Sequence, residues 1–291
     1  MNARSIRRST SRTDDDFVLL HANVYIVDDP PLSLVLTMPI FSTRGGNKGA
    51  HGRYLTDYRL LVDRLLATKP RDEAMLAAVG GHDAIGDLEF VLLDQFGFPD
   101  DGYLIDVGCG SGRLARRVAK LPSARYLGTD VNVRLLQYAR ETAGRIDFRY
   151  HEVDSTFIPE KDNVADMVVL FSVGTHMLNE EFYIYLADAQ RVLKPNGRII
   201  FSFLDFQTTQ GCSVFESMVT TVRSGRTMPH LNAFVGRCDV PVWAKMLGMP
   251  IIEIIPGDIP FAESSERTRS VIGRSVAGEK LGQSVAVLKK L

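Results

Sequence analysis

Apolar residues gather in short runs that alternate with amphipathic stretches from about residue 100 onward. The apolar run over residues 103–107 contains Asp106. Three glycines at alternate positions follow this run, and residues 114–120 beyond them have helical character. This pattern predicts a strand, a tight turn and a helix start. Glycines permit positive φ and let a ligand lie against the backbone, and a helix start offers free N–H groups. The segment therefore predicts a cofactor-binding turn over residues 108–112.

Further runs predict the rest of an alternating α/β arrangement. A second short strand ends at Asp130, and the fifth strand follows a turn at Asn196, a residue type that tolerates left-handed geometry. The remaining predicted strands cover residues 146–153, 166–171, 199–203, 249–255 and 284–290, and predicted helices cover residues 133–143, 181–193 and 240–247.

The regions on either side of these elements differ in character. Residues 1–16 carry four arginines and three aspartates with little apolar content, which predicts a disordered arm. Residues 17–99 form an N-terminal extension in which helical spacing from residue 49 onward predicts a helical cover. Residues 100–291 form the main domain, and residues 204–238 are expected to act as a lid because they follow the carboxyl end of a strand.

Composition favours a soluble enzyme and excludes several other classes. The 291 residues carry a net charge of -1, so no global basic field favours nucleic acid or an anionic membrane. No apolar run approaches the ~20 residues that span a bilayer. The three cysteines are too few and too scattered for a disulfide framework or a metal cluster. A cytoplasmic protein is the expectation.

The spacing of the glycines narrows the choice of cofactor. A dinucleotide fingerprint needs its third glycine where Arg113 stands, and no Gly-Lys-Ser/Thr string follows that would make a P-loop. Asp130 lies where a doubly wound fold places a ribose-binding carboxylate. Asp130 could instead cap the helix over residues 133–143, although Asn132 sits closer to that position.

The sequence Asp-x-Gly-x-Gly-x-Gly from Asp106 resembles motif I of the class I S-adenosylmethionine-dependent methyltransferases. The tail over residues 282–290 resembles the last strand of the bacterial small-molecule type of that family. Four further segments match that family in order, ending with the Lys194–Arg198 turn, which is similar to its Leu-Lys-Pro-Gly-Gly turn. The resemblance implies a Rossmann-like, doubly wound sheet of seven strands in the order 3-2-1-4-5-7-6, with the last strand antiparallel. It also implies S-adenosylmethionine as cofactor, with contacts from Asp106, Gly108, Cys109, Gly110, Gly112, Asp130, Val131, Asp154, Ser155, Phe171 and Ser172.

The implied reaction is in-line methyl transfer to a small-molecule acceptor without a metal. His176 follows the fourth strand and is the first candidate for a general base, which favours a hydroxyl acceptor; His230 in the lid is the second. Capping of the next helix, or a hydrogen bond to a loop carbonyl, is the alternative role for His176. Contacts from Arg53, Tyr54 and Tyr58 to the substrate are expected from the helical cover.

Other functions stay open at this point. An N-methyltransferase, or a protein or RNA methyltransferase, would use the same cofactor site. A catalytically silent S-adenosylmethionine-binding module would keep the glycine turn and Asp130 but lack a closed acceptor pocket.

Overall fold

A computed structural model describes residues 52–79, 83–228 and 230–291. The chain divides into two units, Met1–Gly46 and Asn47–Leu291, and the described residues all belong to the second. The expected arm over residues 1–16 and the first part of the extension over residues 17–99 lie outside the described residues.

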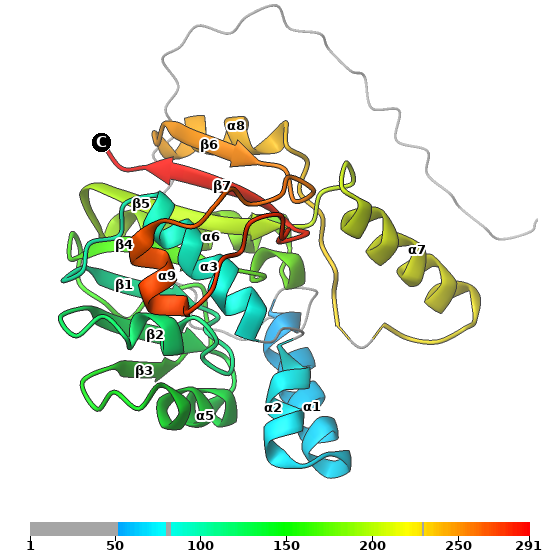
Figure 1. The fold of residues 1–291 in the computed structure, drawn as a ribbon. Coiled ribbons are helices and arrows are strands. Elements are labelled where there is room, and N and C mark those ends of the chain that lie inside the picture. Colours follow the sequence, from blue (N-terminus) through cyan, green and yellow to red (C-terminus); the bar gives the residue numbers. More distant parts are fainter. Residues whose placement is uncertain (1–51, 80–82, 229) are drawn as a thin grey trace, which may run out of the picture. The chain divides into compact units, whose positions relative to one another are not determined.

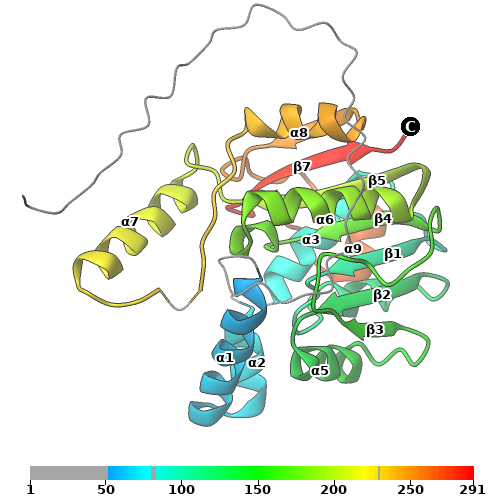
Figure 2. The ribbon, with the colours of Figure 1, turned by 180° about the vertical axis from the view of Figure 1, so that it is seen from behind.

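Seven strands form one sheet in the order β3-β2-β1-β4-β5-β7-β6 (Figures 1 and 2). The last strand in sequence runs antiparallel to both of its neighbours, β5 and β6, and the other pairings are parallel. The expected strand order is therefore confirmed. The strands are β1 (Tyr103–Val107), β2 (Arg125–Asp130), β3 (Arg149–Glu152), β4 (Ala165–Leu170), β5 (Leu193–Phe203), β6 (Ile251–Ile255) and β7 (Ser284–Lys289).

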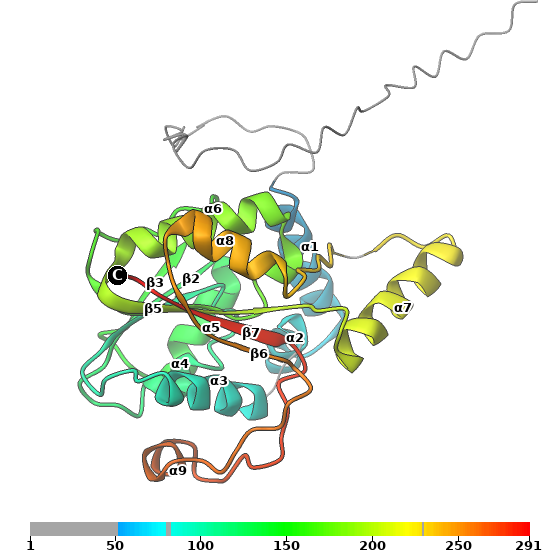
Figure 3. The same cartoon turned by 90° about the horizontal axis from the view of Figure 1, so that it is seen from above.

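Helices cover both faces of this sheet (Figure 3). They are α1 (Arg53–Thr68), α2 (Arg71–Ala78), α3 (Asp83–Gln95), α4 (Ala115–Val118), α5 (Val133–Ala143), α6 (Asn179–Val192), α7 (Thr209–Arg223), α8 (Asp239–Leu247) and α9 (Glu266–Ile272), with a 3₁₀ turn η1 (Gly174–His176). Two predicted helices differ from expectation in length. The helix after the glycine turn has only four residues, and α6 begins two residues before residue 181.

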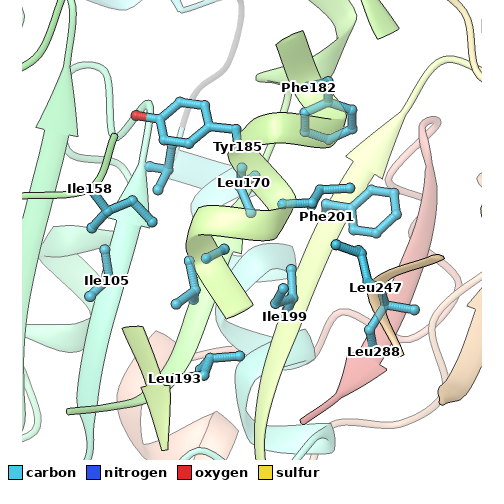
Figure 4. Close-up of a cluster of buried hydrophobic side chains, with 14 of the residues drawn as sticks. Ile105, Ile158, Leu170, Phe182, Tyr185, Leu193, Ile199, Phe201, Leu247 and Leu288 are labelled. Carbon is cyan, nitrogen blue, oxygen red and sulfur yellow. The ribbon is translucent and has the colours of Figure 1, made fainter. Parts of the chain in front are cut away.

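Strand alternation builds two apolar cores, because successive side chains on a strand point to opposite faces. Ile105 of β1 joins the core under α6 and α8, whereas its neighbour Leu104 joins the core under α3, α4 and α9. Figure 4 shows the first core, where Phe182 of α6 lies beside Phe201 of β5. Both cores anchor the carboxyl ends of the central strands, where the predicted site residues lie.

Helix α3 belongs to the predicted helical cover and is largely enclosed. Every residue from Gly86 to Leu93 is buried, including two acids. Asp87 pairs with Arg117 and Arg274, and Glu89 pairs with Arg113. Buried carboxylates need such partners, so charge pairing explains why the polar side of this helix can face protein.

The predicted lid contains α7 and the segment that returns from it. Thr208 caps α7 by accepting a hydrogen bond from the amide of Gly211 at 3.0 Å. Gly211 is the only buried residue of this helix. The returning segment attaches to the sheet end, since the amide of Val235 donates to the Leu204 carbonyl at 3.0 Å. The returning segment of the predicted lid region is thus held at the end of β5.

Candidate active site

The glycine turn after β1 adopts the predicted left-handed backbone. Gly108, Gly110 and Gly112 have φ values of 68°, 54° and 81°, a region that favours glycine. The amide of Cys109 donates to the Thr129 carbonyl at 2.9 Å, which ties the turn to β2. The turn therefore holds its backbone at the carboxyl end of the sheet.

Side chains from two other elements press on this turn. A Cβ placed on Gly108 would lie 2.6 Å from Val173, and one on Gly110 would lie 2.6 Å from Val79. Val173 precedes η1, and Val79 follows α2. The helical cover and the end of β4 thus close over the turn from two directions.

A cavity lies against the turn. We call it the cofactor cavity. Eight of the predicted cofactor contacts line it: Asp106, Gly108, Cys109, Gly110, Asp130, Val131, Phe171 and Ser172.

Three predicted cofactor contacts do not line the cofactor cavity. Gly112 faces α5 instead, where an added Cβ would lie 2.8 Å from the Ala139 Cα, so its small size serves the packing of that helix. Asp154 and Ser155 are exposed, and their neighbour Val153 lines the cavity in their place. The loop after β3 therefore meets the cavity one residue earlier than expected.

Asp130 ends β2 with its carboxylate buried against the turn. One oxygen accepts from the Gly110 amide at 3.0 Å and the other from the Asn132 amide at 2.9 Å. Burial raises the pKa of Asp130 to about 6, and these amides act against that rise. Asn132 caps α5 by accepting from the Arg134 amide at 2.9 Å, so the capping role falls to Asn132. Each carboxylate oxygen of Asp130 keeps acceptor capacity for a ligand.

Asp106 forms the floor of the cofactor cavity from within β1. The Tyr126 hydroxyl donates to its carboxylate at 2.7 Å. Burial raises the pKa of Asp106 to about 7 despite this hydrogen bond. Two carboxylates with raised pKa values therefore line one cavity, which is a feature of functional sites.

Of the three residues of the helical cover that were expected to contact the substrate, two lie at the cofactor cavity. Tyr54 and Tyr58 of α1 line the cofactor cavity, and burial raises the pKa of Tyr54 to about 12, which keeps it neutral. Arg53 is exposed and pairs with Asp57 at 2.9 Å, so it does not line the cavity.

Sequence reasoning missed several lining residues. Val79 and the Glu89–Arg113 ion pair belong to this group, as does Tyr185 of α6, which is 3% exposed. Tyr185 lies on the apolar face of an amphipathic helix, where core residues are the usual occupants. No sequence pattern distinguished it from them.

The two candidate bases lie together, although 54 positions separate them in the chain. The rings of His176 and His230 meet edge to face with centroids 4.9 Å apart, and Tyr58 lies 5.1 Å from His176 and 6.3 Å from His230. Burial lowers the pKa of His176 to about 4 and also lowers the pKa of His230. Both imidazoles are therefore neutral near pH 7.

The tautomer of His176 follows from its partner. Nδ1 lies 2.9 Å from the carbonyl oxygen of Leu231 in the returning segment of the lid. A carbonyl can only accept, so Nδ1 carries the proton and Nε2 keeps its lone pair. The arrangement leaves Nε2 able to accept a proton or a hydrogen bond.

A second cavity, of about 910 Å³, adjoins the cofactor cavity. We call it the acceptor cavity. It contains His230 together with residues that line both cavities: Tyr58, Val79, Glu89, Arg113, Phe171, Ser172 and His176. The shared wall makes the two cavities parts of one site.

Within residues 52–79, 83–228 and 230–291, no group of three or more His, Cys, Asp or Glu side chains is arranged to hold a metal ion. In the same described part of the chain, no helix has the length and apolar character needed to cross a membrane.

Comparison with known proteins identifies relatives of the central part of the chain. A family model described as a methyltransferase domain matches residues 104–197. The chain is 29% identical over 184 residues to the malonyl-[acyl-carrier protein] O-methyltransferase of Hahella chejuensis, which covers 61% of this chain and 62% of that protein. It is 27% identical over 155 residues to the mitochondrial arginine-hydroxylase NDUFAF5 of Danio rerio, covering 53% and 46%. The chain thus spans less than two thirds of the length of these relatives.

A solved structure with the same fold is the magnesium protoporphyrin IX methyltransferase of Synechocystis with bound SAH. Its TM-score is 0.50 at 16% identity, and the match covers 74% of this chain and 85% of that one. At this identity the likeness concerns the fold alone.

Proposed function

Because this chain belongs to the class I S-adenosylmethionine-dependent methyltransferase family, we propose that it transfers a methyl group from S-adenosylmethionine to a hydroxyl oxygen of a small molecule. One observation carries the proposal: Asp130 and the left-handed glycine turn line one cavity, and that cavity opens onto a second one containing His176. The name of the Hahella relative, an O-methyltransferase, supports oxygen as the receiving atom.

The residues of the cofactor cavity suit S-adenosylmethionine. The Asp130 carboxylate can accept hydrogen bonds from two neighbouring sugar hydroxyls, which are stronger than neutral ones because the acceptor is charged. The glycine turn offers a backbone without side chains, against which a ligand can lie. Tyr54 and Tyr58 of α1 line the cavity. When bound, S-adenosylmethionine supplies a methyl group on a cationic sulfur, which keeps the electron pair of the broken bond.

His176 is the base in this proposal. Its Nδ1 proton is held by the Leu231 carbonyl, so Nε2 can take the hydroxyl proton of the acceptor as the oxygen forms its new bond to carbon. The proton then passes to solvent, because a histidine with a pKa near 4 does not keep it at neutral pH. Alignment of the methyl donor in the cofactor cavity with the acceptor in the adjoining cavity contributes more to the rate than proton removal by His176 does.

A titration of the purified protein with S-adenosylmethionine and with NAD tests the cofactor assignment. We expect saturable binding of S-adenosylmethionine and weaker or no binding of NAD, because Arg113 replaces the glycine of a dinucleotide fingerprint. The Asp130→Asn variant should bind S-adenosylmethionine about 10- to 100-fold more weakly, since hydrogen bonds to a charged partner contribute about 1.5–3 kcal/mol.

Asp101→Asn is the matched control, because Asp101 is an exposed carboxylate in the turn before β1. It should bind like the wild type. Unchanged binding by Asp130→Asn, or binding of NAD without S-adenosylmethionine, would contradict the proposal. A product that gains an oxygen atom instead of a methyl group, as the hydroxylase among the relatives would suggest, would also contradict it.

A further inference from the structure

We propose that the acceptor cavity takes an uncharged, largely apolar molecule whose reacting hydroxyl sits on an aromatic ring. This inference rests on the proposed function and adds the chemical class of the acceptor. It follows from the charges, walls and hydrogen-bonding groups of the acceptor cavity.

The described lining of the acceptor cavity carries no uncompensated charge. Its one acid, Glu89, and its one permanent cation, Arg113, form an ion pair with contacts of 2.5 Å and 3.1 Å. Their side chains are only 2% and 12% exposed, so the pair is shielded from solvent. An acceptor with a carboxylate, phosphate or ammonium group would lose its hydration without gaining an ionic partner, which costs several kcal/mol.

Part of the wall of the acceptor cavity is apolar or aromatic. Leu61 of α1, Ile85 of α3 and Leu281 before β7 supply aliphatic surface from three different parts of the chain. The rings of Tyr58, His176 and His230 line the same cavity, with centroid distances of 4.9–6.3 Å between them. Ring faces and edges of this kind favour a planar aromatic partner, because aromatic pairs add stabilisation beyond the buried area.

The hydrogen-bonding groups of the acceptor cavity are neutral as well. The amide of Ser172 donates to the Ser202 hydroxyl at 2.7 Å, and that hydroxyl donates to the Gln283 Oε1 at 2.7 Å. The Ser172 hydroxyl donates to the same oxygen at 3.3 Å. With Oε1 occupied by two hydroxyls, the amide nitrogen of Gln283 can donate to an uncharged substituent, and a second neutral amide, that of Gln210, also lines the cavity.

The strength of the base favours an acidic hydroxyl. A neutral histidine whose pKa lies near 4 is a weak base, so proton removal is easier from a phenol, with a pKa of about 10, than from an aliphatic alcohol. Geometry, charge and basicity thus agree on the same class of acceptor.

Three probes of similar size test this inference: 4-hydroxybenzamide, which is neutral, 4-hydroxybenzoate, an anion, and tyramine, a cation. Each is titrated calorimetrically into the full-length protein with and without S-adenosylhomocysteine. We expect the neutral probe to bind at least about tenfold more tightly than either ion, the factor that corresponds to 1.4 kcal/mol. Equal or tighter binding of an ion by the wild type, or binding of none of the three, would overturn the inference.

A charge variant makes the test sharper. Glu89→Gln leaves Arg113 without its ionic partner at almost unchanged volume, so affinity for 4-hydroxybenzoate should rise about tenfold and affinity for 4-hydroxybenzamide should change little. Glu279→Gln is the matched control, because Glu279 pairs with Arg274 and lines neither cavity. If Glu89→Gln does not fold, the three wild-type affinities decide.

Methyl transfer measured in the same samples separates this inference from the proposed function. Transfer of tritium from [methyl-³H]S-adenosylmethionine to a charged probe would overturn the neutral acceptor class and leave the methyltransferase assignment intact. Failure to bind S-adenosylmethionine or S-adenosylhomocysteine would overturn the proposed function. The probe affinities measured without cofactor would still decide whether this cavity binds neutral or charged aromatic molecules.

Discussion

Gly110 is the position where one added methyl group tests the contact between the helical cover and the glycine turn. An alanine there at a φ of 54° takes on left-handed strain of about 1–2 kcal/mol. Its Cβ would also lie 2.6 Å from Val79 Cγ1, about 1 Å inside the usual carbon–carbon separation of about 3.5–4.0 Å. Such overpacking costs about 1–3 kcal/mol. We expect Gly110→Ala to lower the free energy of unfolding by about 2–5 kcal/mol in total.

Two further variants separate these contributions in urea denaturation. Gly144→Ala is the matched control, because Gly144 has a φ of 67° and nothing within 4 Å of an added Cβ, so only the strain of about 1–2 kcal/mol applies. In the double variant Val79→Ala/Gly110→Ala the clash disappears, which predicts a favourable coupling of about 1–3 kcal/mol. If Gly110→Ala costs no more than Gly144→Ala and Val79→Ala restores nothing, the cover does not close on the turn as described.

Three further predictions concern the acid, the base and the cover. The raised pKa of Asp106 means that the folded protein holds this proton more tightly than the unfolded chain, so its contribution to stability is present below about pH 4 and is lost as the pH rises through about 7. Asp106→Asn should therefore raise the free energy of unfolding at pH 8 by about 1–3 kcal/mol and by less at pH 5, and an equal effect at both values would contradict the burial argument. His176→Ala should leave S-adenosylhomocysteine affinity intact and lower methyl transfer to 4-hydroxybenzamide by about 10²–10⁴-fold, and a loss below about threefold would remove it as the base. S-adenosylhomocysteine should slow amide hydrogen exchange in α1, which lines the cofactor cavity through Tyr54 and Tyr58, but not in α9, and equal effects on both helices would argue against the cover.

Patterns that depend on neighbouring residues were readable from the sequence. The sheet order expected from the resemblance is the observed one, and the α5 helix has the predicted bounds of residues 133–143. Asn196 adopts a φ of 67°, as expected for an asparagine in place of a glycine. The bounds of α5 and the conformation of Asn196 follow from local periodicity, turn chemistry and capping, which act over a few positions, whereas the sheet order was expected from the family resemblance alone.

Contacts between distant segments were not readable in the same way. The partner that fixes the His176 tautomer is a main-chain carbonyl at Leu231, and any residue type could supply it. Val79 presses on the turn because α2 ends there, and its apolar side chain resembles any core residue in the sequence. The pairing of Glu89 with Arg113 joins α3 to the glycine turn, and no local periodicity encodes such a pairing. Tertiary packing decides all three.

A crystal structure of the protein with S-adenosylhomocysteine is the most direct measurement of the proposed site. We predict that the ligand lies over residues 108–112, that its ribose hydroxyls donate to the Asp130 carboxylate, and that its sulfur faces the acceptor cavity beside His176. A ligand bound elsewhere, or a ribose that does not contact Asp130, would contradict the assignment of this cavity to the methyl donor.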